Sequence, residues 1–585
     1  MQEGTVYGRH FCFILCFLLF FVFLALRFFL ASKPHLVCLS IPDILIITFL
    51  VYYLFRSQSN NSEPYQIKQF LLVILYFLTT FLARKMDNNR RLFQTILLIF
   101  TLTVFCQVLT GFSQLIGLNN THHPVFVATG TFWNPGPFGG FLVLSFTLCL
   151  CFAIKKHASF QWRDMVLKTI ARASSVGILV LLVFLKSKAS WLALITSCGF
   201  VFYCLYFAKV FRKSALKQHL IIYFFLFLAV VIIFYFQYNS ARGRVFIWKI
   251  TSTMILDHPV VGVGVGNYSK FFCEHQTGYF KNGNPSDEEK LLAGLGESCF
   301  NEYLQLTSEL GIIGLLLFML FIIILLRRPF FSLLELHRGN HDFIILGAVA
   351  GILGFLIFSL FSYPFSILPM EINLYFLFGI VASCHKKDIS ILFPRFINSF
   401  YFKAILLVIV FIFLVSFLNN SDREIVARKR WQYASGLKTI GNYCKAINIF
   451  KAISPVLKDN AIFLMDFGEA LYLNGLFNES TDILKKSVSL VPHPQTYELL
   501  GKACQNIGNN VDAEKYFLNS VYLVPHRFTP RYSLIRYYLK TQQVEKAIFQ
   551  LNAIIEMPIK VNSLKVRRIK EEAKSLMDSL HLNYN

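Results

Sequence analysis

Residues 310–326 read LGIIGLLLFMLFIIILL, and Arg327 and Arg328 follow directly. An uncharged apolar run of this kind is close to the ~20 residues that a helix needs to cross the hydrocarbon core of a bilayer. Arginines next to such a run mark its cytoplasmic end, because short cytoplasmic loops are enriched in Lys and Arg. The segment therefore predicts a membrane-spanning helix that ends in the cytoplasm.

Similar apolar runs recur before residue 420, and hydrophobic residues make up 55% of the chain. Soluble globular proteins lack this composition, so we expect an all-α, polytopic membrane protein with about twelve spans. The expected spans are residues 10–31, 38–55, 67–83, 92–116, 136–154, 169–187, 190–208, 219–237, 310–326, 343–363, 370–385 and 401–418. The first run is long and lacks a small-residue cleavage site, which favours a membrane helix over a signal peptide.

Positive charge is concentrated in every second loop. The net charge is +24, but Lys and Arg lie in short loops between apolar runs, which argues against nucleic acid as a partner. The basic loops contain Arg84, Lys85, Arg90 and Arg91; Lys155, Lys156 and Arg163; Lys209, Arg212, Lys213 and Lys217; Arg327, Arg328 and Arg338; and Lys386, Lys387 and Arg395. The loops at 56–66, 117–135 and 364–369 contain few Lys or Arg residues. This alternation predicts a multi-pass protein of the bacterial inner membrane, with its N-terminus, the long loop 238–309 and all residues after 419 in the periplasm.

The region after residue 419 is more polar and shows a repeat of about 34 residues, the period of the tetratricopeptide (TPR) unit. A TPR unit has characteristic positions for two small residues, one large residue and one proline. Gly468, Ser480, Leu484 and Pro492 occupy them in one repeat, and Gly501, Ala513, Phe517 and Pro525 occupy them in the next. Ala446 with Phe450 and Ala547 with Leu551 extend the register. We therefore predict a membrane domain over 1–419 and a periplasmic, TPR-like α-solenoid over 420–585 that binds a protein partner. A generic helical bundle is the alternative.

Thirteen cysteines occur in the chain, without a C-x-x-C pair and without a Cys/His cluster of metal-ligand spacing. Several of them, including Cys12, Cys16, Cys106, Cys149 and Cys151, lie inside apolar runs. We expect buried structural thiols, and neither a metal nor a cofactor.

Two short segments at expected periplasmic helix ends carry polar residues. Residues 130–138 read GTFWNPGPF, in which Asn134 precedes a helix start marked by prolines and is suited to cap it. Residues 186–190 read KSKAS, and the cations Lys186 and Lys188 oppose the expected charge bias. They either face an anion at the outer leaflet or extend to lipid head groups.

The large loop carries a third set of motifs. It contains SARGRVFIW from residue 240, HPVVGVGVGNY from residue 258, FNEYLQ from residue 300 and ELGIIG from residue 309. The glycine run lacks the strand and βαβ context of a nucleotide-binding fingerprint. Its backbone amides are nevertheless suited to binding phosphate.

The order R-x-x-x-W, D-H-P-x-x-G-x-G-x-G-N, N-E-Y-L-Q and E-x-G-I-I-G resembles the O-antigen ligase and Wzy-type polymerase superfamily. It is most similar to the ligase-like members, which include protein O-oligosaccharyltransferases. The resemblance covers residues 130–385. It implies transfer of a glycan from undecaprenyl pyrophosphate, at the periplasmic face, to an acceptor hydroxyl. The acceptor is the lipid A core, a Ser or Thr of a periplasmic protein, or another glycan.

The resemblance also implies roles for individual residues. Two conserved cations of the family fall at Lys188, where Arg is usual, and at Arg244. Such cations stabilise the departing pyrophosphate, although Lys grips phosphate less well than Arg. Further contacts with the pyrophosphate or glycan are expected from Arg242, Lys186, Asn134, Trp248 and Asn301.

The chain departs from the family pattern at Phe300, where ligases have the His thought to activate the acceptor. A general base must then come from elsewhere in the loop. Glu302 is our first candidate, although its alternative role is to cap the helix that begins near Tyr303. Glu297 and His275 are the other candidates.

Three other functions remain open. A polymerase of the same superfamily would extend a second lipid-linked glycan. A transporter would need mid-helix ionisable residues and paired repeats, whereas the sequence shows few such charges and no repeat between halves. A scaffold would act through its TPR-like region alone.

Overall fold

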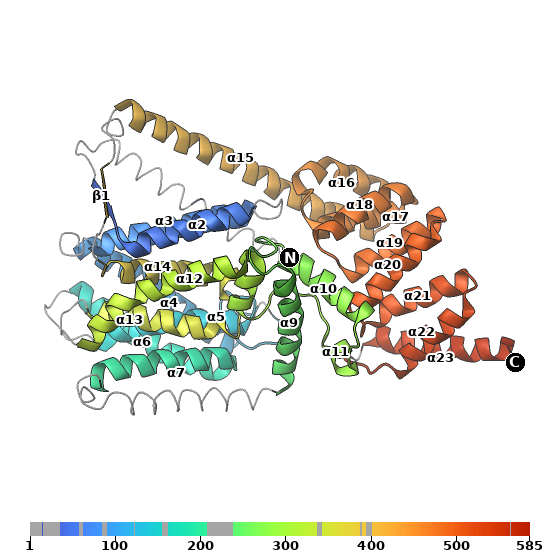
Figure 1. The fold of residues 1–585 in the computed structure, drawn as a ribbon, viewed down its shortest axis with the longest axis horizontal. Coiled ribbons are helices and arrows are strands. Elements are labelled where there is room, and N and C mark those ends of the chain that lie inside the picture. Colours follow the sequence, from blue (N-terminus) through green and yellow to red (C-terminus); the bar gives the residue numbers. More distant parts are fainter. Residues whose placement is uncertain are drawn as a thin grey trace.

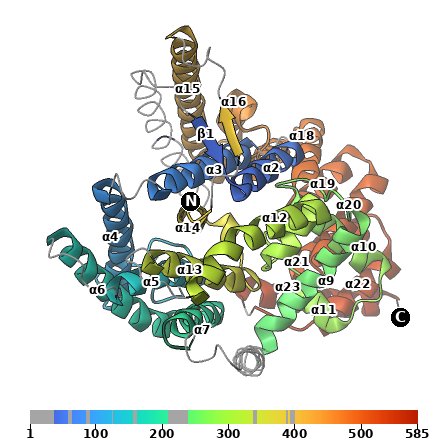
Figure 2. The ribbon, with the colours of Figure 1, turned by 60° about the vertical axis from the view of Figure 1, so that its left-hand side comes forward.

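The computed structural model describes residue 15 and residues 36–57, 63–84, 90–121, 123, 125–154, 162–207, 238–335, 342–385, 389–392, 400–561 and 563–584. Within these ranges the chain is almost entirely helical. Figures 1 and 2 show two regions: a bundle of long helices and an arc of shorter, paired helices. The helices of the large loop lie between them.

The bundle confirms the prediction of an all-α polytopic membrane protein. Its elements are α2 (Ile41–Arg56), α3 (Glu63–Arg84), α4 (Arg90–Leu115), α5 (Pro135–Ile154), α6 (Trp162–Leu185), α7 (Lys188–Phe202) with the π-helix η1 (Tyr203–Phe207), α12 (Glu302–Glu335), α13 (Asp342–Ser359), the 3-10 turn η2 (Pro364–Ser366), α14 (Leu368–Ala382) and α15 (Phe400–Thr439). Among the described residues, six helices are long and apolar enough to span a membrane, and two shorter ones, Phe343–Ser359 and Leu368–Ala382, are also apolar. The predicted spans at 10–31, apart from residue 15, and at 219–237 lie outside the described residues.

The loops that the sequence assigns to one side of the membrane meet at one end of the bundle. Arg56 Nη2 donates to Gly262 O over 2.8 Å, and Tyr52 OH donates to Leu310 O over 2.7 Å. We call this the loop end, because it faces the large-loop helices α9 (Tyr238–Asp257), α10 (Tyr268–Asn282) and α11 (Asp287–Leu292), which lie to its right in Figure 1.

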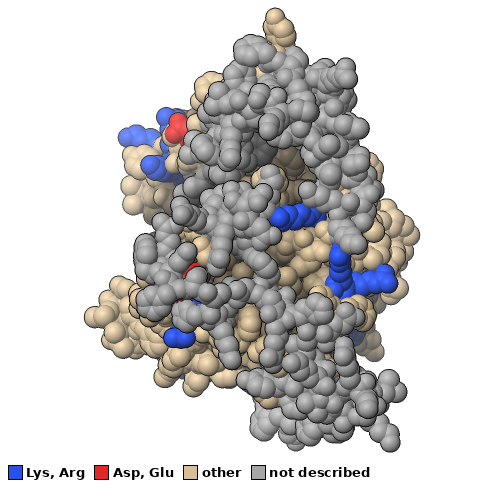
Figure 3. Space-filling view, turned by 90° about the vertical axis from the view of Figure 1, so that its left-hand side faces the viewer, with Lys and Arg blue, Asp and Glu red and all other residues tan. Residues whose placement is uncertain are grey.

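The opposite end carries the only two strands in the described chain, β1 (Leu36–Leu39) and β2 (Ile389–Leu392), which pair antiparallel. The sequence did not predict them. Nearby, Arg84 Nη2 donates to Ala382 O over 3.3 Å and lies 3.2 Å from a carboxylate oxygen of Asp43. Figure 3 looks onto this end and shows Lys and Arg surface in several places and little Asp or Glu.

A buried ion pair joins α3 to α14 near the loop end. Lys68 Nζ lies 2.8 Å from Glu371 Oε2, and the two side chains are 5% and 0% exposed. Gln69 Nε2 donates to the same carboxylate over 3.2 Å. Lys68 Nζ also donates to Phe365 O in η2 over 3.2 Å. The pair therefore fixes η2, the turn between α13 and α14, to the bundle.

Replacing Lys68 with methionine is expected to destabilise the protein by about 3–5 kcal/mol, because Glu371 would then be a buried charge without its cation. Unfolding of the detergent-solubilised protein by heat or denaturant measures the loss. The double variant Lys68→Met, Glu371→Leu removes both charges and should recover most of it. Equal stability of the single variant and the wild type would contradict this role of the ion pair.

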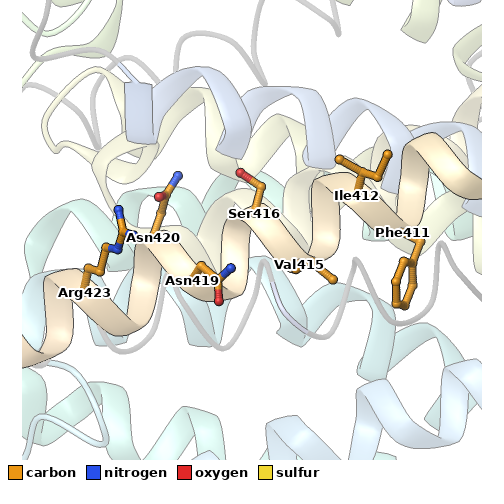
Figure 4. Close-up of a pocket in the computed structure, with 7 residues that line it drawn as sticks. All are labelled: Phe411, Ile412, Val415, Ser416, Asn419, Asn420 and Arg423. Carbon is orange, nitrogen blue, oxygen red and sulfur yellow. The ribbon is translucent and has the colours of Figure 1, made fainter.

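Helix α15 carries the chain from the membrane region into the paired helices without a loop. It has 40 residues and so is about 60 Å long. Figure 4 shows Phe411 and Ile412 on one stretch of α15 and Asn419, Asn420 and Arg423 further along it. The change from apolar to polar side chains matches the expected end of the last span at residue 418. The predicted domain boundary at 419–420 therefore lies within a continuous helix.

The C-terminal helices pair as the repeat predicts. They are α16 (Tyr443–Leu457), α17 (Ala461–Leu473), α18 (Phe477–Leu490), α19 (Pro494–Ile507), α20 (Asn510–Leu523), α21 (Phe528–Lys540), α22 (Val544–Glu556) and α23 (Leu564–Tyr584). A Cβ atom on Gly468 would lie 2.5 Å from Leu484, and one on Gly501 would lie 2.9 Å from Phe517. Small residues thus allow α17 to approach α18, and α19 to approach α20, at the predicted spacing. The proline after each pair follows the end of α18 or α20.

Candidate functional site

The candidate site lies at the loop end, where α9 packs against the turn that precedes α12. Arg244 and Trp248 are four residues apart and therefore lie on one face of α9. Trp248 Nε1 donates to Cys299 O over 3.0 Å. From the other side, Cys299 N donates to Gln305 Oε1 in α12 over 3.1 Å. These two bonds fix the backbone directly before Phe300.

Phe300 has a strained backbone, with φ at +55°. A bulky residue in the left-handed region costs on the order of 1–3 kcal/mol and persists only where its surroundings hold it, which is common at functional sites. Asn301, expected to contact substrate, caps α12: its Oδ1 accepts hydrogen bonds from the amides of Tyr303 and Leu304 over 3.0 and 3.1 Å. The sequence left capping of this helix as an alternative role for Glu302, but in the structure Asn301 is the residue that caps it.

Arg244 is half-buried and faces the Phe300 ring, with 5.7 Å between the guanidinium carbon and the ring centre. Tyr363, in the loop before η2, packs edge-on against the same ring with centroids 5.2 Å apart. Among the described residues Arg244 has neither an ion pair nor a hydrogen bond. A desolvated guanidinium without an anionic partner is suited to receive one from a substrate.

Burial and neighbouring charges shift the pKa values of Arg244 and Tyr363. Burial lowers the pKa of Arg244, and Tyr363 opposes this shift. Burial raises the pKa of Tyr363, Glu297 raises it further and Arg244 lowers it. Arginine keeps its proton in proteins, so Arg244 is a cation, and the raised pKa of Tyr363 leaves its phenol a hydrogen-bond donor at neutral pH. Sequence reasoning missed Tyr363, since a tyrosine in a short loop carries no motif.

Arg242 lies on a different face of α9. Its Nη1 pairs with Glu288 Oε1 of α11 over 2.5 Å, and both side chains are exposed. Lys249, the residue after Trp248, pairs with Glu289 of α11 over 2.6 Å. The structure thus separates the two arginines of the motif. Arg244 faces the candidate site, and Arg242 joins α9 to α11.

Glu302 lies beneath the site and not within it. The side chain is 4% exposed, and its Oε1 accepts a hydrogen bond from Phe365 N over 2.7 Å. Phe365 belongs to η2, directly after the loop that carries Tyr363. Together with Lys68, which bonds to Phe365 O, Glu302 therefore holds the Tyr363 loop in place.

The other two candidate bases have different surroundings. Glu297 is exposed and lies close enough to Tyr363 to shift its pKa. His275 Nε2 lies 2.9 Å from Asp257 Oδ2, and its Nδ1 bonds to Phe271 O over 2.7 Å. Both ring nitrogens of His275 are thus engaged within the loop.

The predicted segments around Asn134 and Lys188 come together at the start of α5. Asn134 Oδ1 accepts from Gly136 N over 2.9 Å, which confirms that it caps the helix start. Next to it, a Cβ atom on Gly139 would lie 2.5 Å from Ser190 Oγ, so the turn that carries Lys186 and Lys188 packs on α5. Lys186 is exposed and has a positive φ of 51°.

The end of α13 separates this turn from Arg244. On one side, a Cβ atom on Gly140 of α5 would lie 2.5 Å from the Phe358 ring. On the other side, Tyr303 OH of α12 donates to Leu356 O over 2.8 Å. Lys188 and Arg244 therefore lie at the same end of the bundle, on the two sides of α13.

The glycine run serves the fold and not a phosphate. The amides of Val263 and Gly264 donate to Ser308 O and Glu309 O, each over 2.9 Å. Gly262, Gly264 and Gly266 all have positive φ, as does Gly311, which breaks α12. The run thus packs into the break of α12, and the phosphate role that the sequence allowed for its amides is not supported, because these amides already bond within the protein. No cluster of three or more His, Cys, Asp or Glu that suits a metal occurs in the ranges given above.

Comparison with known proteins identifies the region around the site. Residues 173–319 match the family described as O-antigen ligase, and this range contains Lys188, Arg244, Glu297 and Glu302. No curated protein matches the sequence. Two solved structures are similar to part of the chain: "MamA RS-1 ArsTM double mutant", at 16% identity with a TM-score of 0.22 over 28% of this chain and 86% of that one, and "Crystal structure of MamA protein", at 22% identity with a TM-score of 0.22 over 26% and 85%.

Proposed function

We propose that this membrane protein, which carries an O-antigen ligase domain at residues 173–319, transfers a glycan from a polyprenyl pyrophosphate such as undecaprenyl pyrophosphate to an acceptor hydroxyl. The observation that carries the proposal is Arg244. It is a half-buried guanidinium without an anionic partner in the described chain, held beside the strained Phe300 and the Tyr363 phenol. A pyrophosphate provides the charge that this environment lacks.

We place the loop end at the periplasmic face of the bacterial inner membrane. The opposite end carries the basic loops, and its described surface shows more Lys and Arg than Asp and Glu (Figure 3). By the positive-inside rule that end is cytoplasmic. The candidate site and the TPR-like region, both at the loop end, are then periplasmic.

The reaction requires one bond to form and one to break. The acceptor hydroxyl oxygen attacks the anomeric carbon of the donor, and the bond from that carbon to the pyrophosphate oxygen breaks with its electron pair left on the pyrophosphate. Negative charge grows on the leaving group, where Arg244 and the Tyr363 hydroxyl stabilise it. We assign Lys188 and Lys186 to the pyrophosphate or the outer-leaflet lipid that carries it, and Trp248 to supporting the turn before Phe300.

The acceptor proton must pass to a base, and we assign that role to Glu297. Glu302 was the first candidate from the sequence, but its carboxylate is buried and bonded to the amide of Phe365. Glu297 is exposed and lies near Tyr363, and therefore near Arg244. A base needs direct access to the hydroxyl of the acceptor. Glu297 has this access, and Glu302 acts by positioning Tyr363.

The TPR-like region favours a protein acceptor over a second lipid-linked glycan. Helical repeats present an extended surface that binds protein segments, and α10 of the large loop packs against the repeat helix α20 (Figure 2). A protein O-oligosaccharyltransferase is therefore our first candidate, and ligation to the lipid A core is the second. A polymerase gives the repeats no evident task.

Deletion of the gene, followed by blotting of total glycan with and without protease digestion, tests this proposal. We expect the loss of glycan bands that protease removes from the parent strain. Loss of a protease-resistant ladder would instead indicate ligation to lipid or polymerisation. An unchanged glycan profile would contradict glycan transfer and favour a scaffold or a transporter.

A further inference from the structure

The large loop and the TPR-like region share an apolar contact. Helix α10 packs against α20, and the two lie side by side in Figures 1 and 2. Cys273 of α10 and Leu523 and Val524 at the end of α20 form a buried cluster, on which Leu295 and Tyr497 pack. Leu295 belongs to the segment that leads to the candidate site. The contact therefore connects the repeats with that segment.

A single amide side chain stands at the centre of this contact. Gln276 of α10 is 0% exposed. Its Nε2 donates to Leu523 O of α20 over 2.6 Å and to Gly294 O over 2.9 Å. Through its amide nitrogen, Gln276 thus bonds both to the end of a repeat helix and to the start of the segment 293–301. A buried amide with two acceptors is costly to replace, because both carbonyls would lose their partner.

Two side chains from the repeats extend the contact to the residues before this segment. Lys560 Nζ donates to Leu291 O over 2.7 Å, and His526 Nδ1 faces Lys290 O over 3.3 Å. These two bonds satisfy backbone carbonyls at the end of α11, where a helix leaves them unpaired, and Gln276 bonds the carbonyl of Gly294 just beyond it. The repeats therefore support the chain at residues 290 and 291 directly, and at residue 294 through Gln276.

The segment 293–301 has neither helix nor strand, so its conformation depends on its contacts. It carries Glu297 and the strained Phe300. At its far end Trp248 holds Cys299 O. In its middle Gly296 lies so close to the Phe272 ring that a Cβ atom would be 2.1 Å from a ring carbon. Its near end is held by Gln276 and α20.

We infer that Gln276 is a positioning residue, through which the TPR-like region holds the segment 293–301 in the conformation that presents Glu297 and Phe300 to the site. The repeats are then a structural part of the site as well as a surface for a partner. The expected effect of Gln276 on glycan transfer rests on the proposed function, whereas its expected effect on the conformation of the segment 293–301 does not.

The test compares Gln276→Met with Gln550→Met in the full-length protein in lipid nanodiscs. Methionine keeps the length of the side chain and removes the amide. Gln550 is the matched control: it is 9% exposed and bonds to Arg531, so that its bond joins two helices of the repeats. Hydrogen exchange followed by mass spectrometry reports on peptides that cover 293–301, and kinetics with a lipid-pyrophosphate glycan report on transfer.

For Gln276→Met we expect exchange in 293–301 to be about tenfold faster, with kcat about 10–100-fold lower and KM for the donor within about threefold, since small displacements of reacting groups cost rate more than binding. Gln550→Met should leave that segment and kcat unchanged. Unchanged exchange in 293–301 for Gln276→Met would refute the inference, and so would equal changes across the whole protein in both variants. Faster local exchange in a protein whose wild type transfers no glycan would support the positioning role and count against the proposed function.

Discussion

Replacing Arg244 with alanine is expected to reduce glycan transfer by on the order of 10²–10³-fold while the protein still inserts and folds. The guanidinium has no ion-pair or hydrogen-bond partner in the described chain whose loss would unfold the loop, and it faces the ring of Phe300. What is lost is the stabilisation of charge on the departing pyrophosphate. The measurement is single-turnover transfer by purified protein with a lipid-linked glycan donor.

Two further variants sharpen this test. Arg244→Lys keeps the charge without the bidentate geometry and should recover part of the rate. Arg242→Ala removes a neighbouring arginine whose exposed pair with Glu288 contributes about 0–1 kcal/mol, so its rate should fall by no more than a few-fold. Full activity of Arg244→Ala, or an equal loss in Arg242→Ala, would show that we have assigned the wrong cation.

Replacing Glu297 with glutamine is expected to lower kcat by about 10²–10⁴-fold, because glutamine cannot accept the proton of the acceptor hydroxyl. Binding of the donor should be unchanged, since the role we propose for Glu297 concerns the acceptor. Transfer kinetics over a range of pH, with a separate measurement of donor binding, check both expectations.

Variants of Glu302 provide the comparison for Glu297→Gln. Glu302→Gln keeps an oxygen that accepts from the Phe365 amide, so a positioning role predicts a rate within about tenfold of wild type. Glu302→Ala removes the acceptor, frees the Tyr363 loop and should lower both rate and stability. If Glu302→Gln is inactive and Glu297→Gln is active, the assignment of the base must be reversed.

The sequence alone determined the features that depend on local patterns. Apolar runs such as 310–326 predict membrane helices because the thickness of the bilayer sets their length. The spacing of Gly468 and Leu484 predicts paired helices because close approach needs a small residue at a fixed position. The order of short motifs located the candidate site and named Arg244 within it. Each of these signals lies in a short stretch of chain.

The tertiary structure alone decided which of the named residues face one another. Arg242 and Arg244 are two residues apart, yet the helical turn directs one to Glu288 and the other to Phe300. Glu302 looked like a base but bonds to Phe365, and Tyr363, which no motif marked, lies at the site. Gln276 and Leu523 meet although 247 positions separate them. Such contacts depend on packing between distant segments, which the periodicity of one segment does not encode.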